Sequence, residues 1–213
     1  MPALFITFEG IDYSGKTLQS RLLSEHLQAM QLPVLTLRDP GATRISEKIR
    51  DLLLDETLAE MAPITELLLY EAARSQMVEQ LIKPALAQGC IVIADRFYDS
   101  TTAYQGFARG LDLELVQAAN RIGRCGLTPD HTFLLDLDPA IALQRKRAVG
   151  RDADRIEQEG LSFQQRVRAG YLHVAKMEPN RISVIEGNDA AEVIQQRILD
   201  IFIQRFSMQV SIH

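Results

Sequence analysis

The chain has 213 residues, of which 46% are hydrophobic and 24% are charged, and its formal net charge is -5. This composition is typical of one globular domain, and the acidic balance argues against broad binding of polymeric nucleic acid. No secretory pattern opens the sequence, and no apolar stretch approaches the roughly 20 residues of a membrane span, so we expect no membrane partner. The cysteines Cys90 and Cys125 form no Cys-x-x-Cys motif and suit a reducing cytoplasm.

Predicted strands alternate with predicted helices along the chain. Short apolar or β-branched runs indicate strands at 3–8, 34–37, 90–95, 131–137 and 181–186. Helical spacing of apolar residues lies between and after these runs, over 15–30, 46–55, 63–87, 99–107, 112–124, a segment opening at Pro139, and 190–206. Pro84 is expected to kink the helix at 63–87 or to divide it. The alternation predicts a single α/β domain over 1–213, with a mainly parallel five-stranded sheet that helices cover on both faces.

A charged stretch at 146–160, KRAVGRDADRIEQEG, interrupts the apolar pattern between two predicted helices. Its glycines and its lack of apolar periodicity indicate a mobile lid at about 149–160 rather than a domain boundary. A solvated helix face explains the cations at 145–147 as well as a function does. Arg151 and Arg155 are harder to dismiss, because the chain is acidic overall, and both are candidates for binding phosphate.

The residues GIDYSGKT, from Gly10 to Thr17, match the pattern G-x-x-x-x-G-K-[ST] and join a predicted strand to a predicted helix. The two glycines let successive backbone N–H groups point inward, and the helix N-terminus adds partial positive charge. Lys16 is expected to reach the β- and γ-phosphates of a nucleotide, and Thr17 to place its hydroxyl on Mg²⁺. The loop predicts a nucleoside triphosphate, which we expect to be ATP, bound by Gly10, Ile11, Asp12, Tyr13, Ser14, Gly15, Lys16, Thr17 and Leu18.

The class of reaction follows from what accompanies this loop. No Asn-Lys-x-Asp motif, which reads guanine in GTPases, occurs in the chain, and 213 residues are few for a motor-type ATPase. A small kinase remains, so the sequence should also contain an acceptor site.

The segment DRFYDSTTAYQG, at 95–106, follows the central predicted strand. Asp95 ends that strand beside the phosphate loop, where ligands bind in open α/β sheets, and it can hold Mg²⁺ through water. Arg96 offers a planar guanidinium that suits a phosphate group.

Three pairs at i,i+4 spacing would share helix faces near this point: Ser100 with Tyr104, Thr101 with Gln105, and Tyr70 with Arg74. An aromatic ring and an arginine could seat a nucleobase, and an amide that both donates and accepts suits a pyrimidine edge. A tyrosine at the edge of the core beside a solvated arginine is the alternative for the last pair.

These motifs resemble those of bacterial thymidylate kinases. The resemblance follows the family order along nearly the whole chain: FEGID and SGKT at 8–17, RDPGAT at 38–43 with Glu47 and Arg50, LLLYEAAR at 67–74, DRFYDSTTAYQG at 95–106, LTPDHTFLLDLDP at 127–139, and RIEQEGLSF at 155–163. It implies the P-loop nucleoside monophosphate kinase fold with a mobile lid, and Mg²⁺-dependent phosphorylation of dTMP by ATP, giving dTDP for dTTP synthesis. It also implies a homodimer.

The resemblance assigns roles to individual residues. It gives Asp12 a contact with the sugar 3′-hydroxyl and the metal region, and it makes Tyr70 stack on thymine and Tyr104 pack beneath the deoxyribose, where a 2′-hydroxyl would clash. Arg96, with Arg38 nearby, would bind the dTMP phosphate. The implied dTMP-binding residues are Asp12, Arg38, Tyr70, Arg74, Arg96, Ser100, Thr101, Tyr104 and Gln105, with Arg74 and Gln105 reading the base edge. The implied catalytic residues are Lys16, Asp12, Arg96, Arg155 and Arg151, and no general base is needed because the attacking phosphate oxygen is already ionised.

Tyr13 is the least expected departure from the family pattern, which usually has a small residue there. Some members place an arginine in this loop, so here the clamp on the moving phosphoryl group would come from the lid, through Arg155 with Arg151 second. Two alternatives stay open. One is a kinase with another acceptor, such as a different nucleoside monophosphate or a deoxynucleoside, and the other is a silent nucleotide-binding module, which Tyr13 favours.

Overall fold

The computed structural model describes residues 3–149 and 154–210. Within these residues a five-stranded sheet has the order β2-β3-β1-β4-β5, and each neighbouring pair is parallel. The strands are β1 (Leu4–Glu9), β2 (Val34–Arg38), β3 (Ile91–Asp95), β4 (His131–Asp136) and β5 (Ile182–Glu186). The predicted five-stranded parallel sheet is therefore confirmed.

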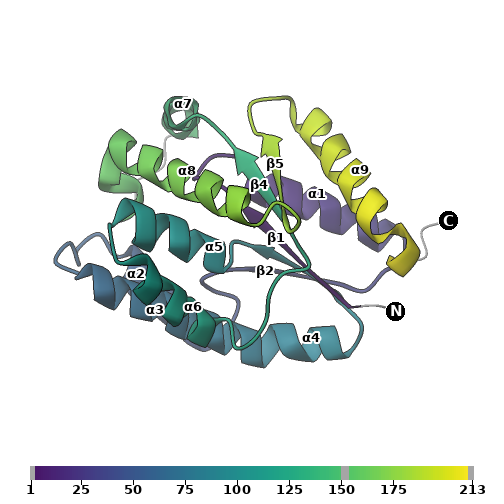
Figure 1. Cartoon of the computed structure of the whole chain (residues 1–213), viewed down its shortest axis with the longest axis horizontal. Helices are drawn as coiled ribbons and strands as arrows, with labels where there is room; N and C mark the ends of the chain where they lie inside the picture. The colour runs from purple at the N-terminus through teal and green to yellow at the C-terminus, as the bar shows by residue number, and fades with distance from the viewer. Residues whose placement is uncertain (1–2, 150–153, 211–213) are drawn as a thin grey trace.

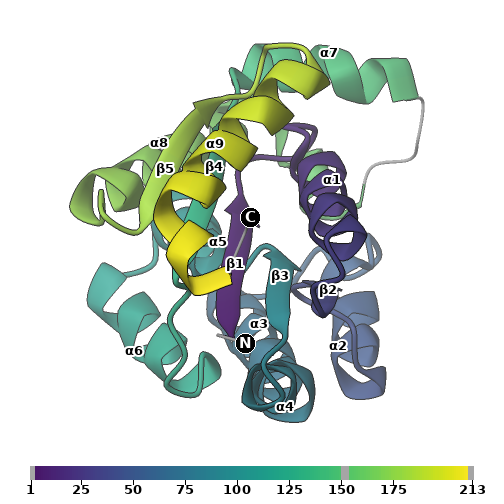
Figure 2. The same ribbon diagram turned by 90° about the vertical axis from the view of Figure 1, so that its right-hand side faces the viewer.

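Helices cover both faces of the sheet (Figures 1 and 2). They are α1 (Lys16–Ala29), α2 (Arg44–Leu54), α3 (Pro63–Met77), α4 (Lys83–Ala87), α5 (Tyr98–Thr101), α6 (Leu113–Gly123), α7 (Pro139–Val149), α8 (Gly160–Met177) and α9 (Ala191–Val210). Side chains alternate along β1, so Phe8 packs with Leu23 of α1 and Phe202 of α9 on one face. Phe5 packs with Met77 of α3 on the other. The central strand is thus buried on both faces, as parallel strands are.

Two segments of π-helix interrupt the predicted helices. The first, Val78–Ile82, lies between α3 and α4, and Pro84 sits at the start of α4. The helix predicted at 63–87 is thus interrupted, but by a widened turn that ends before Pro84 rather than by Pro84 itself. The second, Thr102–Ala108, continues α5 and contains Tyr104 and Gln105. Such turns are frequent at functional sites.

The predicted lid falls partly outside the described residues. Arg151 belongs to the segment 150–153, which is not described, so its role stays a prediction. The part that is described includes a short 3-10 turn at Glu157–Glu159 and leads into α8. Ile156 is buried in a core cluster that also contains Phe163 of α8. Among the described helices, none is both long and apolar enough to span a membrane.

Candidate active site

The phosphate loop joins β1 to α1, as the sequence predicts. Gly10 has φ 141°, and a Cβ atom there would lie 2.5 Å from the carbonyl oxygen of Leu135, so only glycine fits. Gly15 immediately precedes α1 with φ 99°, and Tyr13 also has a positive φ, of 63°. The loop therefore holds a non-glycine residue in the left-handed region, a strain that is typical of functional sites.

The side chain of Tyr13 turns toward α7 and α8. A small apolar hollow there is lined by Tyr13, Pro139, Ala142 and Leu161, among others. The carbonyl oxygen of Tyr13 accepts a hydrogen bond from Arg145 Nη1 at 3.1 Å. The bulky ring thus lies in the cleft between these two helices.

Lys16 is buried and folds back on its own loop. Its ammonium group donates to the carbonyl of Ile11 at 3.1 Å and lies 3.8 Å from Asp12 Oδ1. Burial and the positive charge of Arg96 lower the pKa of Lys16, while Asp12 acts in the opposite direction. A phosphate group near this ammonium would favour its charged form.

The residues predicted to bind Mg²⁺ lie together at the start of α1. Thr17 Oγ1 donates to Asp95 Oδ2 at 2.5 Å. Mg²⁺ prefers oxygen ligands and usually keeps waters and substrate phosphates, with only one or two protein groups, so this donor set fits the ion. Within 3–149 and 154–210, no group of three or more His, Cys, Asp or Glu side chains is placed to hold a metal ion.

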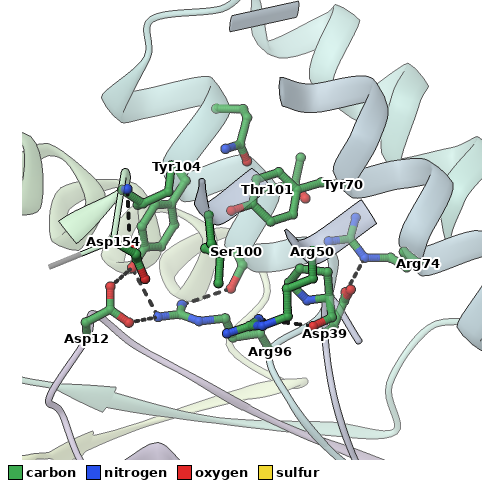
Figure 3. Close-up of a pocket in the computed structure, with 14 residues that line it drawn as sticks. Asp12, Asp39, Arg50, Tyr70, Arg74, Arg96, Ser100, Thr101, Tyr104 and Asp154 are labelled. Carbon is green, nitrogen blue, oxygen red and sulfur yellow. Dashed lines mark hydrogen bonds and ion pairs between the residues drawn. The ribbon is translucent and has the colours of Figure 1, made fainter. Parts of the chain in front are cut away.

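A pocket lies beside the phosphate loop (Figure 3). It contains eight of the nine residues predicted to bind the acceptor: Asp12, Tyr70, Arg74, Arg96, Ser100, Thr101, Tyr104 and Gln105. We call it the inner pocket. Asp39, Pro40, Arg50, Leu54, Asp154 and Ile156, which were not predicted as site residues, complete the lining.

Arg38 is the ninth predicted residue, and it does not line the inner pocket. It faces an adjoining outer groove that also contains Lys16, Thr17, Leu18 and Asp95. There its guanidinium pairs with Glu47 at 2.8 Å.

Arg96 lies at one end of the inner pocket, together with Asp12, Ser100 and Tyr104. We call this the Arg96 end. Arg96 has φ 73°. One guanidinium nitrogen donates to the carbonyl of Gly10 at 3.0 Å, and the other to Asp12 Oδ1 at 2.7 Å. Burial alone would raise the pKa of Asp12, but the charges of Arg96 and Lys16 outweigh it and lower this pKa to about 2.

Behind Arg96 lies Glu9, whose side chain is 0% exposed. Its carboxylate accepts from the backbone N–H of Phe97 at 2.7 Å, from Ser100 Oγ at 2.6 Å and from the Tyr171 hydroxyl at 2.9 Å. The same two hydroxyls accept from Arg96. Burial and, after it, the negative charge of Asp99 raise the pKa of Glu9 to about 7, outweighing the charge of Arg96 and the hydrogen bonds from Ser100 and Phe97. The bond to Phe97 fixes the chain directly after the strained Arg96.

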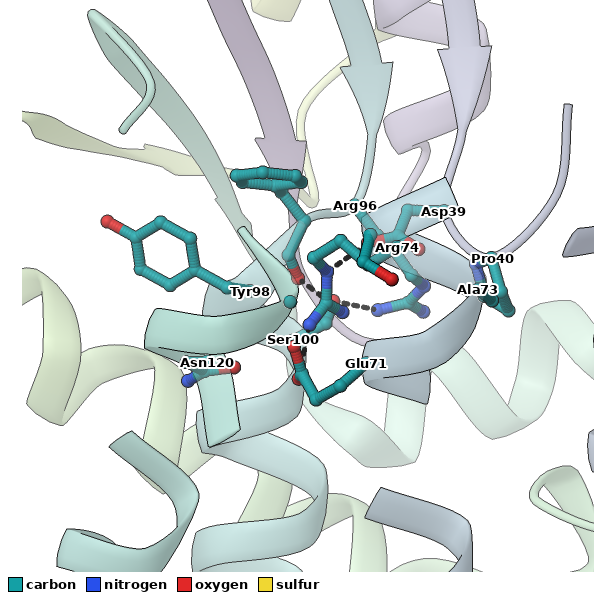
Figure 4. A network of polar contacts seen from close by, with 12 residues as sticks. Asp39, Pro40, Glu71, Ala73, Arg74, Arg96, Tyr98, Ser100 and Asn120 are labelled. Carbon is teal, nitrogen blue, oxygen red and sulfur yellow. Dashed lines mark hydrogen bonds and ion pairs between the residues drawn. The ribbon is translucent and has the colours of Figure 1, made fainter. Parts of the chain in front are cut away.

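The opposite end, which we call the Gln105 end, is lined by Tyr70, Arg74 and Gln105, and the buried Glu66 contacts Gln105 from outside the pocket lining. Arg74 is buried, and its guanidinium contacts Asp39 and Glu71, each at 2.5 Å (Figure 4). Gln105, which is 2% exposed, donates through Nε2 to Glu66 Oε1 at 2.8 Å. Tyr70 lies beside Thr101 in the same pocket (Figure 3).

Arg155, the predicted clamp, forms an ion pair with Glu66 and does not contact the phosphate loop. It is 8% exposed, its Nη2 is 2.6 Å from Glu66 Oε2, and its Nε donates to the carbonyl of Leu53 at 2.9 Å. The structure thus brings most of the predicted site residues together but leaves Arg155 at the Gln105 end.

Comparisons with known proteins agree with this geometry. A sequence model described as thymidylate kinase matches residues 8–198. The chain belongs to the thymidylate kinase family. It is 48% identical over 204 residues to a thymidylate kinase of Chlorobaculum parvum, covering 92% of this chain and 94% of the relative. It is 44% identical over 211 residues to one of Pelotomaculum thermopropionicum, covering 96% and 98%.

A solved structure gives the same answer for the fold. The crystal structure of thymidylate kinase from Ehrlichia chaffeensis aligns with a TM-score of 0.78 at 35% identity, covering 95% of this chain and 99% of that one. The predicted nucleoside monophosphate kinase fold is confirmed. As a thymidylate kinase, the protein is an enzyme that uses ATP to phosphorylate dTMP to dTDP.

Two buried glutamates of this thymidylate kinase, Glu9 and Glu66, were not predicted as part of the site. Glu9 lies within the FEGID motif, so its place beside the phosphate loop was a usable signal. Glu66 carries no such signal, because it lies one residue before the motif LLLYEAAR and its partners come from other helices.

Proposed function

We propose that the outer groove and phosphate loop hold ATP, that the inner pocket holds dTMP, and that the two phosphates meet at Arg96. The observation that supports this division is that Asp12 and Arg96 line both hollows. A group bound in either hollow would therefore contact the same guanidinium. Since phosphoryl transfer depends mainly on positioning and charge stabilisation, this shared boundary is where the reacting atoms should lie.

At the Arg96 end, the protein would supply positive charge without taking a proton. The guanidinium of Arg96 would bind the dTMP phosphate, and the ammonium of Lys16 would bind the β- and γ-phosphates. Asp12 would accept from the sugar 3′-hydroxyl, since its low pKa keeps it an acceptor at neutral pH. Tyr104, which touches both Asp12 and Arg96 through its hydroxyl, would pack beneath the deoxyribose and exclude a 2′-hydroxyl.

At the Gln105 end, the protein would recognise the base. Tyr70 would stack on thymine. Arg74 would donate toward a carbonyl oxygen of the base, and Gln105 would offer its amide to the ring N3–H. Ser100 and Thr101 would complete the wall between the base and the phosphate.

We propose Mg²⁺ as the cofactor, bound at Thr17 and, through water, at Asp95. Bound there, the ion would neutralise charge on the nucleotide phosphates. The Thr17–Asp95 hydrogen bond supports this, because it brings two oxygen ligands together beside the phosphate loop.

Arg155 remains the proposed clamp of the lid, with Arg151 second. To reach the moving phosphoryl group, Arg155 must break its ion pair with Glu66 and contact the nucleotide when ATP binds. Replacing Arg155 with Ala should then lower kcat far more than dTMP affinity. Unchanged turnover would remove this residue from the mechanism.

We also propose a homodimer and a cytoplasmic location. Helices α2, α3 and α6 lie side by side (Figure 1). They carry apolar side chains that are 40% to 75% exposed: Ile45 and Leu52 of α2, Ile64 and Leu68 of α3, and Leu115 and Ile122 of α6. Such a patch marks an interface more often than a free surface. Light scattering should give a dimer that Ile122→Glu converts to a monomer, and a monomeric parent would refute it. The two cysteines are free thiols, which suits the cytoplasm.

The assignment is tested by measuring ADP release with Mg-ATP and each of dTMP, dUMP, UMP, dCMP, AMP and GMP. We expect strong turnover with dTMP, weaker turnover with dUMP, and little with the ribonucleotide UMP. Lys16→Ala is the control and should show no turnover above the blank. ADP release that does not depend on dTMP would favour a silent nucleotide-binding module.

A further inference from the structure

Glu66 is a buried carboxylate that the phosphoryl transfer itself does not use. It lies in the first turn of α3 and is 1% exposed. Besides Gln105 and Arg155, it accepts from Arg109, through Nε and Nη2 at 3.1 Å each. Two hydrogen-bonding side chains from the π-helical segment and its C-terminal cap, and one ion pair from the lid, therefore converge on this one carboxylate.

These donors keep Glu66 ionised. Burial alone would raise the pKa of Glu66, but hydrogen bonds from Arg109 and Gln105 outweigh it and lower this pKa. An ionised carboxylate can only accept hydrogen bonds. Only the amide nitrogen of Gln105 can therefore face Glu66, because the opposite orientation would bring two oxygens together between two buried side chains.

The fixed nitrogen determines what Gln105 offers to a ligand. With Nε2 held by Glu66, the carbonyl oxygen Oε1 lies on the far side of the amide, and Gln105 lines the inner pocket. An acceptor at this point suits thymine and uracil, whose N3 carries a hydrogen. It repels cytosine, whose N3 is itself an acceptor. We propose that Glu66 is a specificity-determining residue, which excludes cytosine nucleotides by fixing the orientation of the Gln105 amide. This inference rests on the proposed role of Gln105 in reading the base.

The direct test is Glu66→Gln, which keeps the shape of the side chain but lets it donate as well as accept. The Gln105 amide can then turn its NH₂ group toward N3 of cytosine. The ratio of kcat/KM for dTMP to that for dCMP should fall by about tenfold or more. The discrimination should be lowered and not abolished, because Arg74 still faces the base.

dUMP supplies the internal control. Uracil presents the same hydrogen-bonding edge as thymine, so the ratio of dTMP to dUMP should not change in Glu66→Gln. General damage to the pocket would shift both ratios. Asp99→Asn is the matched variant, since Asp99 is also buried and held by an arginine, Arg181, but does not line the inner pocket. It should leave both ratios at the parent values.

Gln105→Leu separates this inference from the function on which it depends. If Gln105→Leu leaves the ratio of dTMP to dCMP unchanged, Gln105 does not read the base and the proposed role fails. If Gln105→Leu lowers the ratio and Glu66→Gln does not, the role of Gln105 stands and the inference about Glu66 is overturned.

A measurement on the parent protein covers the case in which Glu66→Gln does not fold. The side-chain NH₂ signal of Gln105 can be assigned by NMR from its loss in Gln105→Leu. Its hydrogen exchange should be slow in the free protein and stay slow with dTMP bound, because the group remains on Glu66. Fast exchange in either state, or a contact between that NH₂ group and thymine, would overturn the proposal.

Discussion

The Arg96 end of the inner pocket is organised around Glu9, and the Gln105 end around Glu66. Both carboxylates are buried, at 0% and 1% exposure. Glu9 contacts hydroxyls and a backbone N–H, and burial raises its pKa to about 7. Glu66 contacts two arginines, and despite its burial its pKa is lowered. Burial acts in the same direction on both glutamates, and only at Glu66 do directly bonded arginines outweigh it.

This difference matches what each end has to do. The Arg96 end must receive a doubly negative phosphate. There Glu9 holds Arg96 only indirectly, through the hydroxyls of Ser100 and Tyr171, so Glu9 itself forms no ion pair with the guanidinium. The Gln105 end must present one fixed pattern to a neutral base, and a carboxylate held by Arg109 on one side and by the Gln105 amide on the other gives that rigidity. Variants at the two ends should therefore fail in different ways.

The largest effect is expected for Arg96→Ala. It removes the guanidinium that bridges the two hollows, so kcat/KM for dTMP should fall by about 10²–10³-fold. Gln105→Leu, at the Gln105 end, should lower kcat/KM for dTMP by only about tenfold to hundredfold, because a neutral hydrogen bond is lost. Steady-state kinetics with both variants measures the contrast, with the exposed Arg121→Ala as control. Equal losses of kcat/KM in Arg96→Ala and Gln105→Leu would contradict the different roles proposed for the two ends.

A second contrast concerns stability. Glu66→Gln removes the charge that faces two partly or fully buried arginines, so the free energy of unfolding at pH 8 should fall by about 3 kcal/mol. Glu9→Gln removes a buried charge that has no directly bonded cation, and its cost at pH 8 should stay within about 1 kcal/mol. Urea unfolding of both variants and the parent gives the two numbers. A larger loss in Glu9→Gln than in Glu66→Gln would contradict the account of their partners.

The pH dependence of stability should come from the Arg96 end. The pKa of Glu9 is raised in the folded protein from 4.5 to about 7, so between these values the folded state binds the extra proton. Stability from this group is complete below about pH 4.5 and is lost as pH rises through about 7, by at most about 1.4 kcal/mol per pH unit. The difference in unfolding free energy, parent minus Glu9→Gln, should therefore fall from pH 5 to pH 7.5 and level off.

The corresponding difference in unfolding free energy for Glu66 should rise with pH only in acid and be constant near neutrality. Its lowered pKa favours the folded state above the unfolded pKa and loses this contribution only in acid. The unfolding free energy of the parent minus that of Glu66→Gln should thus be constant from pH 6 to pH 8. A decrease over that range would show that Glu66 takes up a proton near neutrality, against the role of its arginines.

The sequence predicted the Arg96 end better than the Gln105 end. The phosphate loop is a contiguous motif, and Asp95 with Arg96 directly follows a strand, so strand order places them together. Tyr70, Arg74 and Gln105 were reached through i,i+4 spacing. That Gln105 lies in π-helix was not predictable, since such a turn depends on what packs against it.

Glu66 and the position of Arg155 could not be predicted for a related reason. A glutamate in the first turn of an exposed-looking helix is usually solvated. Glu66 is buried because Arg109, 43 residues later, and Arg155 of the lid reach it. The role of Arg38 stays a prediction: this residue ends strand β2, pairs with Glu47 and lines the outer groove, which it shares with Arg96 and Asp12.

The smallest effect is expected for Tyr13→Gly, which lies at neither end. Glycine relieves the positive φ of 63°, a gain of up to about 1 kcal/mol, but the ring contacts with α7 and α8 are lost, so stability should change little. KM for dTMP should stay within about twofold, because Tyr13 does not line the inner pocket. Any change should appear in KM for ATP, because the substitution alters the backbone of the phosphate loop. A large rise in KM for dTMP would show that the loop and the Arg96 end are coupled more tightly than their contacts indicate.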